Sequence, residues 1–285
     1  MQQFVFASTF LTLGLAATVA ADDAVTFKLA QPKPEDRVRV SQSEKTKLTR
    51  TTTINGKKSI VTDQNATAWV YVGEVVAKGK DDEPKMTRTY LKYQVVNNGK
   101  LEQGPPLKVP ITIEKKGDAF AFAAGKRQLP PEFVKRLEAE FSPATKGVAP
   151  VDMLPDKPIK VGGSWMIDAT KAFQGTGQVM LDADRGTMTG KLVKTYQKDS
   201  RQFALLEFIA SAPIKSLGPN VALMPKDGSV AELRLTVDAC IDGTEPYSRT
   251  AGSTIFRVEA DIPGGAIQLV SETHKTESIE LVPKK

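Results

Sequence analysis

The chain has 285 residues, with 39 Lys and Arg against 33 Asp and Glu, a formal net charge of +6 and 40% hydrophobic residues. These proportions are ordinary for a globular protein, and the length is enough for one large domain or two smaller ones. A single cysteine, Cys240, excludes an intrachain disulfide, and one cysteine with one histidine excludes a structural zinc site. We therefore expect no metal and no cofactor.

The first segment is typical of an export signal. Residues 4–21 carry no charge, and their apolar run ends in small residues at Ala20 and Ala21, which suits signal-peptidase cleavage. Polar residues interrupt this run, which is marginal for the ~20 residues that span a bilayer, so cleavage is favoured over an anchor. We expect residues 1–21 to be removed, no later transmembrane segment, and a protein that is exported to the periplasm or the medium. Export argues against a nucleic-acid partner.

Positive charge is concentrated in one half of the mature chain. Residues 22–149 hold 23 Lys and Arg against 16 Asp and Glu, whereas residues 150–285 hold 16 against 17. A basic half can favour a lipid headgroup or another anionic envelope component such as an acidic polysaccharide. The alternative is an ordinary solvated surface.

Short runs rich in Val, Ile, Thr and aromatic residues, separated by glycine turns, predict antiparallel sheet along most of the chain. Asn55-Gly56, Asn98-Gly99 and Asp242-Gly243 are the strongest hairpin signals, because a type I′ turn needs positive φ at both central residues. The predicted strands cover 25–30, 37–53, 59–78, 86–96, 107–115, 118–123, 177–183, 188–197, 202–211, 229–241, 247–260 and 266–282.

The predicted strand 86–96 shows the clearest alternation of side chains. Successive residues of a strand point to opposite faces of a sheet. The pattern places Leu91, Tyr93 and Val95 on one face, with Arg88 and Tyr90 on the other, followed there by Lys92 and Gln94.

One segment breaks the strand pattern. Phe133, Leu137 and Phe141 follow helical spacing and Pro131 suits a first turn, so the sequence predicts a helix over 131–141. A second, shorter helix is a candidate at 168–174. The proline-rich stretch 143–160 is predicted to link an N-terminal β unit, 22–142, to a C-terminal β unit, 161–285.

The predicted fold is mainly β, as two antiparallel and possibly duplicated units or as one large curved sheet or half-barrel. KLTRTTTINGKKS at 47–59 and RLTVDACIDGTEP at 234–246 share Leu-Thr, then Ile, Asn or Asp, and Gly, at an offset of 234 − 47 = 187. Such a match favours a repeated hairpin, although chance matches are common in Thr-rich sequence.

Catalytic groups are scarce. Strand alternation puts His274 in a row with Glu272, Thr276 and Ser278 on a solvated face, and a general base there would need a serine and an acid from elsewhere. Asp182 and Asp184 lack the further ligands of a calcium loop and indicate a turn instead. Paired carboxylates for glycoside cleavage leave no signature in sequence, so a hydrolase remains a third hypothesis.

The stretch LPDKPIKVGGSWMID, 154–168, raises a choice between a nucleophile loop and a turn. Ser164 has no base beside it, and Gly162-Gly163 permits a tight bend. We predict a turn followed by a short strand, with Trp165 and Ile167 on one side and Met166 on the other.

The same stretch carries a resemblance. Pro155, Lys157 to Val161, Gly162, Ser164 and Trp165 match a P-x-[KR]-P-[VI]-K-V-G-[DG]-S-W segment, and the chain resembles an uncharacterised family of exported bacterial β-rich proteins of unknown function that carries it. The family more often has Asp where this chain has Gly163. The resemblance implies two β-rich parts flanking the segment and assigns no catalytic residue. At the level of fold, a long curved sheet is also similar to half-barrel lipoprotein carriers of the bacterial envelope.

Taken together, these features predict an exported, non-catalytic protein that binds a lipid-like or other amphiphilic ligand in a sheet-lined concavity. The candidate ligand-lining residues are Trp69, Tyr71, Tyr90 and Trp165. The alternative is a structural or interaction protein of the bacterial envelope without a small-molecule ligand.

Overall fold

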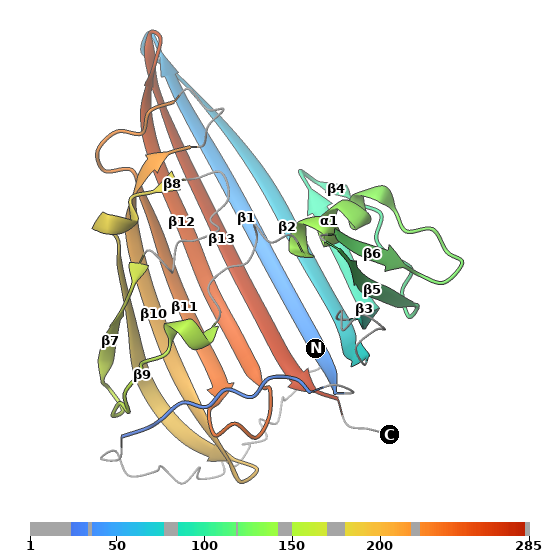
Figure 1. The fold of residues 1–285 in the computed structure, drawn as a ribbon. Helices are drawn as coiled ribbons and strands as arrows, with labels where there is room; N and C mark the ends of the chain where they lie inside the picture. The colour runs from blue at the N-terminus through green and yellow to red at the C-terminus, as the bar shows by residue number, and fades with distance from the viewer. Residues whose placement is uncertain are drawn as a thin grey trace, which may run out of the picture.

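The computed structural model describes residues 24–33, 36–76, 85–117, 119–141, 150–169, 180–217 and 223–282. In these residues thirteen strands form one open antiparallel sheet in the order β6-β5-β3-β2-β1-β13-β12-β11-β10-β9-β7, with β4 beside β3 and β8 beside β10 (Figure 1). The strands are β1 (Arg37–Ile54), β2 (Lys57–Val76), β3 (Lys85–Asn97), β4 (Lys100–Leu101), β5 (Pro110–Lys116), β6 (Ala119–Ala123), β7 (Ser164–Ile167), β8 (Met180–Leu181), β9 (Thr187–Lys198), β10 (Arg201–Ser216), β11 (Val230–Cys240), β12 (Ser248–Ile262) and β13 (Gly265–Leu281).

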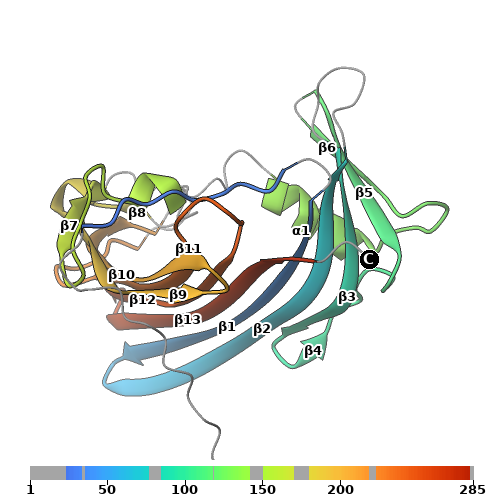
Figure 2. The same ribbon diagram turned by 90° about the horizontal axis from the view of Figure 1, so that it is seen from below.

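The mainly β prediction is confirmed in its single-sheet form. β1, from the N-terminal half, pairs with β13, the last strand, from Val38–Leu281 to Ile54–Gly265. The two halves of the chain therefore share one continuous ladder. Figure 2 shows that the sheet is curved, and register shifts in β2–β3 and β9–β10 contribute, because a bulge bends its strand.

Two of the three predicted tight turns are confirmed. Asn55 and Gly56 have φ of 48° and 76°, and Asn98 and Gly99 have 45° and 79°, as type I′ turns require. The prediction at Asp242-Gly243 is wrong, because β11 and β12 are joined by the longer loop 241–247. In this loop the Asp242 carboxylate accepts hydrogen bonds from the Thr244 backbone N–H and hydroxyl.

The two hairpins compared at an offset of 187 also differ in register. Leu48 pairs with Asp63 in the first, so an equivalent second hairpin would pair Leu235 with Thr250. Leu235 instead pairs with Gly252, two residues further along, which accommodates the longer loop.

Residues of β3 depart from simple alternation. A register shift opposite Val70 and Tyr71 leaves Leu91 without a partner in the ladder and 40% exposed. Tyr90 and Tyr93 consequently lie on the same face, with ring centroids 5.9 Å apart. The predicted separation of Tyr90 and Arg88 from Tyr93 and Val95 is therefore wrong, because a bulge adds one residue and reverses the face that follows it.

Two other predicted strands are shorter than expected. Residues 25–30 make only isolated bridges, Val25 to Ile159 and Lys28 to Asp242, because this segment crosses the sheet end and packs Val25 on its core. Of 177–183, only Met180–Leu181 is a strand among the described residues, and a 3-10 turn, η3 (Ala183–Arg185), follows it. This turn confirms the interpretation of Asp182 and Asp184.

The predicted helix is confirmed as α1 (Pro131–Phe141). Its buried Phe133 and Leu137 pack on Tyr90, Ile111 and Ile113 of β3 and β5. The second helix candidate falls mostly on residues 170–179, outside the described part of the chain. Within the predicted linker, the described residues include η2 (Pro150–Met153), whose Met153 packs on the core at the other end of the sheet.

Asp242 provides a test of the loop that replaces the predicted turn. Hydrogen bonds from the Thr244 hydroxyl, and then from the Gln202 and Thr244 N–H groups and Cys240, hold the pKa of Asp242 well below its ordinary value of about 4. Because the folded-state pKa is depressed, the carboxylate stabilises the fold above that ordinary value, and this stabilisation is lost as pH falls.

We expect Asp242→Asn to lower the thermal midpoint at pH 7, with the gap to wild type narrowing between pH 5 and pH 2. Thermal unfolding over a pH series measures this gap. Asp184→Asn on the exposed η3 turn controls for the loss of one charge. A gap that stays constant across the series would show that the hydrogen bonds do not depend on the charge.

Candidate functional site

The curved sheet has two faces, and α1 and η2 lie on the same one, here called the inner face (Figure 2). The ladder carries Leu235 of β11 across to Gly252, Lys275, Glu44 and Thr67. Because Leu235 packs against the β9–β10 core, these residues share the inner face. Their sequence neighbours face the opposite, outer side.

Three of the four predicted ligand-lining aromatics lie together at one end of the inner face. Tyr71 and Tyr90 have ring centroids 5.4 Å apart, and Trp69 stacks on Tyr93 at 6.2 Å. Tyr90 is buried under α1, whereas Trp69 and Tyr71 are partly exposed. Trp69 therefore lies at the rim of this cluster, on β2 opposite Gln42 of β1.

Trp165 lies at the opposite end. It belongs to β7, which follows a turn at Gly162 with φ of 84°, as predicted from the glycine pair. Its ring packs edge-on against Phe208, and its Nε1 donates to the Met153 carbonyl at 2.8 Å. Met166, on the other side of β7, is 71% exposed.

Tyr93 was not among the residues predicted to line a ligand site, yet it completes the aromatic cluster. Its ring packs edge-on against Phe133 of α1 at 5.4 Å and against a close-fitting Gly104. Burial raises the pKa of Tyr93 to about 12, and its hydroxyl is buried without a hydrogen-bond partner among the described residues. Only the bulge in β3 brings Tyr93 to this face.

The middle of the inner face has a polar band. The Thr46 and Thr273 hydroxyls lie 3.0 Å apart across β1 and β13. Beside them Glu44 is opposite Lys275, whose Nζ is 3.3 Å from the Glu277 carboxylate. The Lys275 and Glu277 side chains are 47% and 30% exposed, so solvent reaches this band.

An apolar strip borders the polar band. Phe256 and Leu269 are half-buried and extend a small core of Ile214, Ala231 and Val258 along the inner face. Leu48 follows on β1, opposite Ser271, and is also half-buried. The inner face thus combines charge, hydroxyl groups and partly exposed apolar surface within neighbouring strands.

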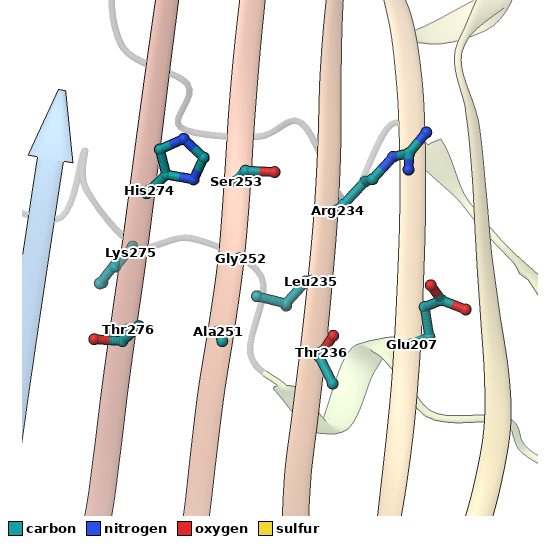
Figure 3. Close-up of a pocket in the computed structure, with 10 residues that line it drawn as sticks. All are labelled: Glu207, Arg234, Leu235, Thr236, Ala251, Gly252, Ser253, His274, Lys275 and Thr276. Carbon is teal, nitrogen blue, oxygen red and sulfur yellow. The ribbon is translucent and has the colours of Figure 1, made fainter. Parts of the chain in front are cut away.

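The outer face carries an open groove across β10 to β13, which reaches β1 at Ser41; Figure 3 shows the part over β10 to β13. Two overlapping hollows form it, of about 350 Å³ and 460 Å³. Arg234, Ser253 and His274 lie side by side in one row across β11, β12 and β13. Four residues further along the strands, Asp238 lies opposite Arg249. The groove therefore crosses from β10 to β13 and β1 and also extends along the strands from the Arg234 row to the Asp238 row.

His274 lies where the strand pattern predicted, exposed on the outer face with Thr276 and Ser278. It is opposite Ser253, but no acidic side chain among the described residues forms an ion pair or hydrogen bond with its ring. The described residues also contain no group of three or more His, Cys, Asp or Glu side chains placed to hold a metal ion. Cys240 is buried.

Comparisons with protein-family profiles, with curated proteins and with solved structures found no match to this chain. In the described residues, neither α1 nor any other helix is both long and apolar enough to cross a membrane.

Proposed function

We propose that this protein is an exported, non-catalytic binding protein that holds an amphiphilic ligand against the inner face of its sheet. The observation that carries the proposal is the polar band of Thr46, Thr273 and Lys275 directly beside the half-buried Leu48 and Phe256. A ligand with a polar head and an apolar tail would suit both surfaces at once. Its head would form hydrogen bonds with the polar band while its tail packed on the apolar strip.

The head group would lie on the Glu44–Lys275–Glu277 charges, and the tail would follow Leu48, Phe256 and Leu269 towards the small core of β10 to β12. A charged head group placed here exchanges water for fixed polar partners, which avoids leaving a buried charge unpaired. Trp69, at the rim of the aromatic cluster, would contact the ligand from β2.

The test is binding of a dansyl-labelled C11 fatty acid to delipidated protein, followed by fluorescence. Leu48→Asn should weaken probe binding about tenfold, because a half-buried leucine contributes roughly 1.4 kcal/mol of contact. Thr49→Asn, one residue along on the outer face of β1, should leave the affinity unchanged. Thermal midpoints of both variants verify that they fold.

A protein that neither binds the probe nor carries lipid detectable by mass spectrometry would refute the ligand half of the proposal. That result would favour the alternative, an envelope protein that contacts partners without a small-molecule ligand. Equal losses in Leu48→Asn and Thr49→Asn would also refute inner-face binding, since the two side chains lie on opposite faces.

A further inference from the structure

The outer-face groove has a shape that suits an extended ligand. Its floor is the outward side of β12, where the small Ala251 and Ser253 lie between larger side chains of β11 and β13. Strands are about 4.8 Å apart, so the two walls are separated by roughly 10 Å. The five residues from Arg249 to Ser253 extend it by about 13 Å along the strand.

The arginines of this groove differ from their neighbours on the outer face. Arg257 pairs with Glu232 at 2.5 Å, and Arg39 lies 4.0 Å from Glu280. In contrast, Arg234 and Arg249 are both exposed and form no ion pair with any described residue. Two guanidinium groups are thus left available at opposite ends of one groove.

The carboxylate closest to Arg249 in the ladder is already engaged. Asp238 accepts the Tyr196 hydroxyl with both oxygens, at 2.7 and 2.9 Å, although it lies opposite Arg249. Arg249 itself lies over the Tyr247 ring at 5.7 Å. This end of the groove therefore presents a guanidinium and aromatic rings together.

Hydroxyl groups supply most of the remaining polar lining. Ser253, Thr236 and Thr276 border one hollow, and Ser41 and Ser278 border the other. Each hydroxyl can both donate and accept, which matches the hydroxyl groups of a sugar ring. The groove lies in the middle of the sheet, where ladder pairing already uses the backbone groups, so an extended peptide could not add as a strand.

We propose that the outer groove binds an acidic oligosaccharide, with sugar hydroxyls on the Ser and Thr side chains that line it and two of its acid groups on Arg234 and Arg249. The planar guanidinium group binds carboxylate or sulfate through paired hydrogen bonds, which a neutral sugar cannot form. This site is separate from the amphiphile site of the proposed function, because the two lie on opposite faces of the same strands.

Calorimetric titration with a hexamer of galacturonic acid at low ionic strength tests the proposal. Wild type should bind the acidic hexamer, and Arg234→Gln with Arg249→Gln should weaken binding at least tenfold. Ala251→Leu should weaken it similarly, because the new side chain fills the floor of the groove. Arg257→Gln removes one charge from the same face of β12 and should change the affinity less than twofold, since Arg257 is already paired.

Each comparison can also refute the proposal. Absence of binding by wild type, or equal binding of a neutral cellohexaose, would overturn an acidic saccharide as the ligand. Equal binding of polyphosphate would show that the groove selects charge and not a sugar. A loss in Arg257→Gln as large as that in the double variant would mean that net charge, and not this groove, holds the ligand. Probe binding at the inner face should be unaffected by all three variants.

Discussion

Glu140→Ala is expected to lower the free energy of unfolding by about 2 kcal/mol, less than the roughly 3 to 5 kcal/mol of a fully buried ion pair, because the Glu140 side chain is 45% exposed. Arg88 is 8% exposed and binds the Glu140 carboxylate with two nitrogens, at 2.7 and 3.0 Å. Its guanidinium also lies between the Tyr71 and Phe141 rings, at 4.4 and 4.9 Å. Removing the carboxylate leaves a buried cation supported by the two aromatic faces and the Tyr90 hydroxyl, without a compensating negative charge.

Removing the other partner of the ion pair, Arg88, should be less damaging. Arg88→Met replaces the charge with an apolar side chain of similar length, and the 45% exposed Glu140 can then be hydrated, so we expect a loss below about 1 kcal/mol. Urea unfolding of both variants gives the comparison, and Lys135→Ala, which removes an exposed pair on the same helix, should cost under about 0.5 kcal/mol. Arg88→Met as damaging as Glu140→Ala would contradict this account.

Local signals made much of the fold predictable. A type I′ turn needs left-handed residues, and Asn55-Gly56 and Asn98-Gly99 supply them within two positions. The helix over 131–141 likewise depends on residues one turn apart. By contrast, β9 and β10 are joined at Asp199-Ser200, with φ of 52° and 60°, and no glycine marks that turn.

Long-range pairing was not predictable. Nothing in the sequence of β1 or β13 alone indicates that they are neighbours. Their pairing joins segments from opposite ends of the chain, so it depends on the order of all the strands between them. The bulge beside Leu91 is also invisible in the pattern of β3, and this single residue decides that Tyr90 and Tyr93 share a face.

The same limit applies to the sites. Alternation placed His274 on a solvated face, as found, but Arg234 and Ser253 come beside it only through the register of three strands. Trp69, Tyr71 and Tyr90 could be named as aromatics on strands, whereas their separation from Trp165 by the width of the sheet follows from strand order. Residue type is local information, but strand order depends on the whole chain.

Gly190→Val, on β9, is expected to be the most damaging single change in the half of the sheet that holds Trp165. It should lower the free energy of unfolding by about 3 kcal/mol, and Gly190→Ala should lower it by about 2 kcal/mol. Gly190 pairs with both Trp165 and Phe208. A Cβ atom there would come within 3.0 Å of three indole atoms of Trp165, and the Nε1 bond to Met153 prevents the ring from moving freely. In an ordinary strand position the same change to alanine would be favourable.

A double-mutant cycle separates this clash from other effects. Trp165→Leu removes the ring atoms that Gly190 accommodates, so adding Gly190→Ala to it should cost far less than the roughly 4 to 8 °C of thermal midpoint expected in the wild-type background. Gly73→Ala is the matched control, because a Cβ at Gly73 meets Tyr71 at 3.4 Å, an ordinary contact. Additive losses in the cycle would mean that Gly190 is needed for its backbone and not for the space it leaves to Trp165.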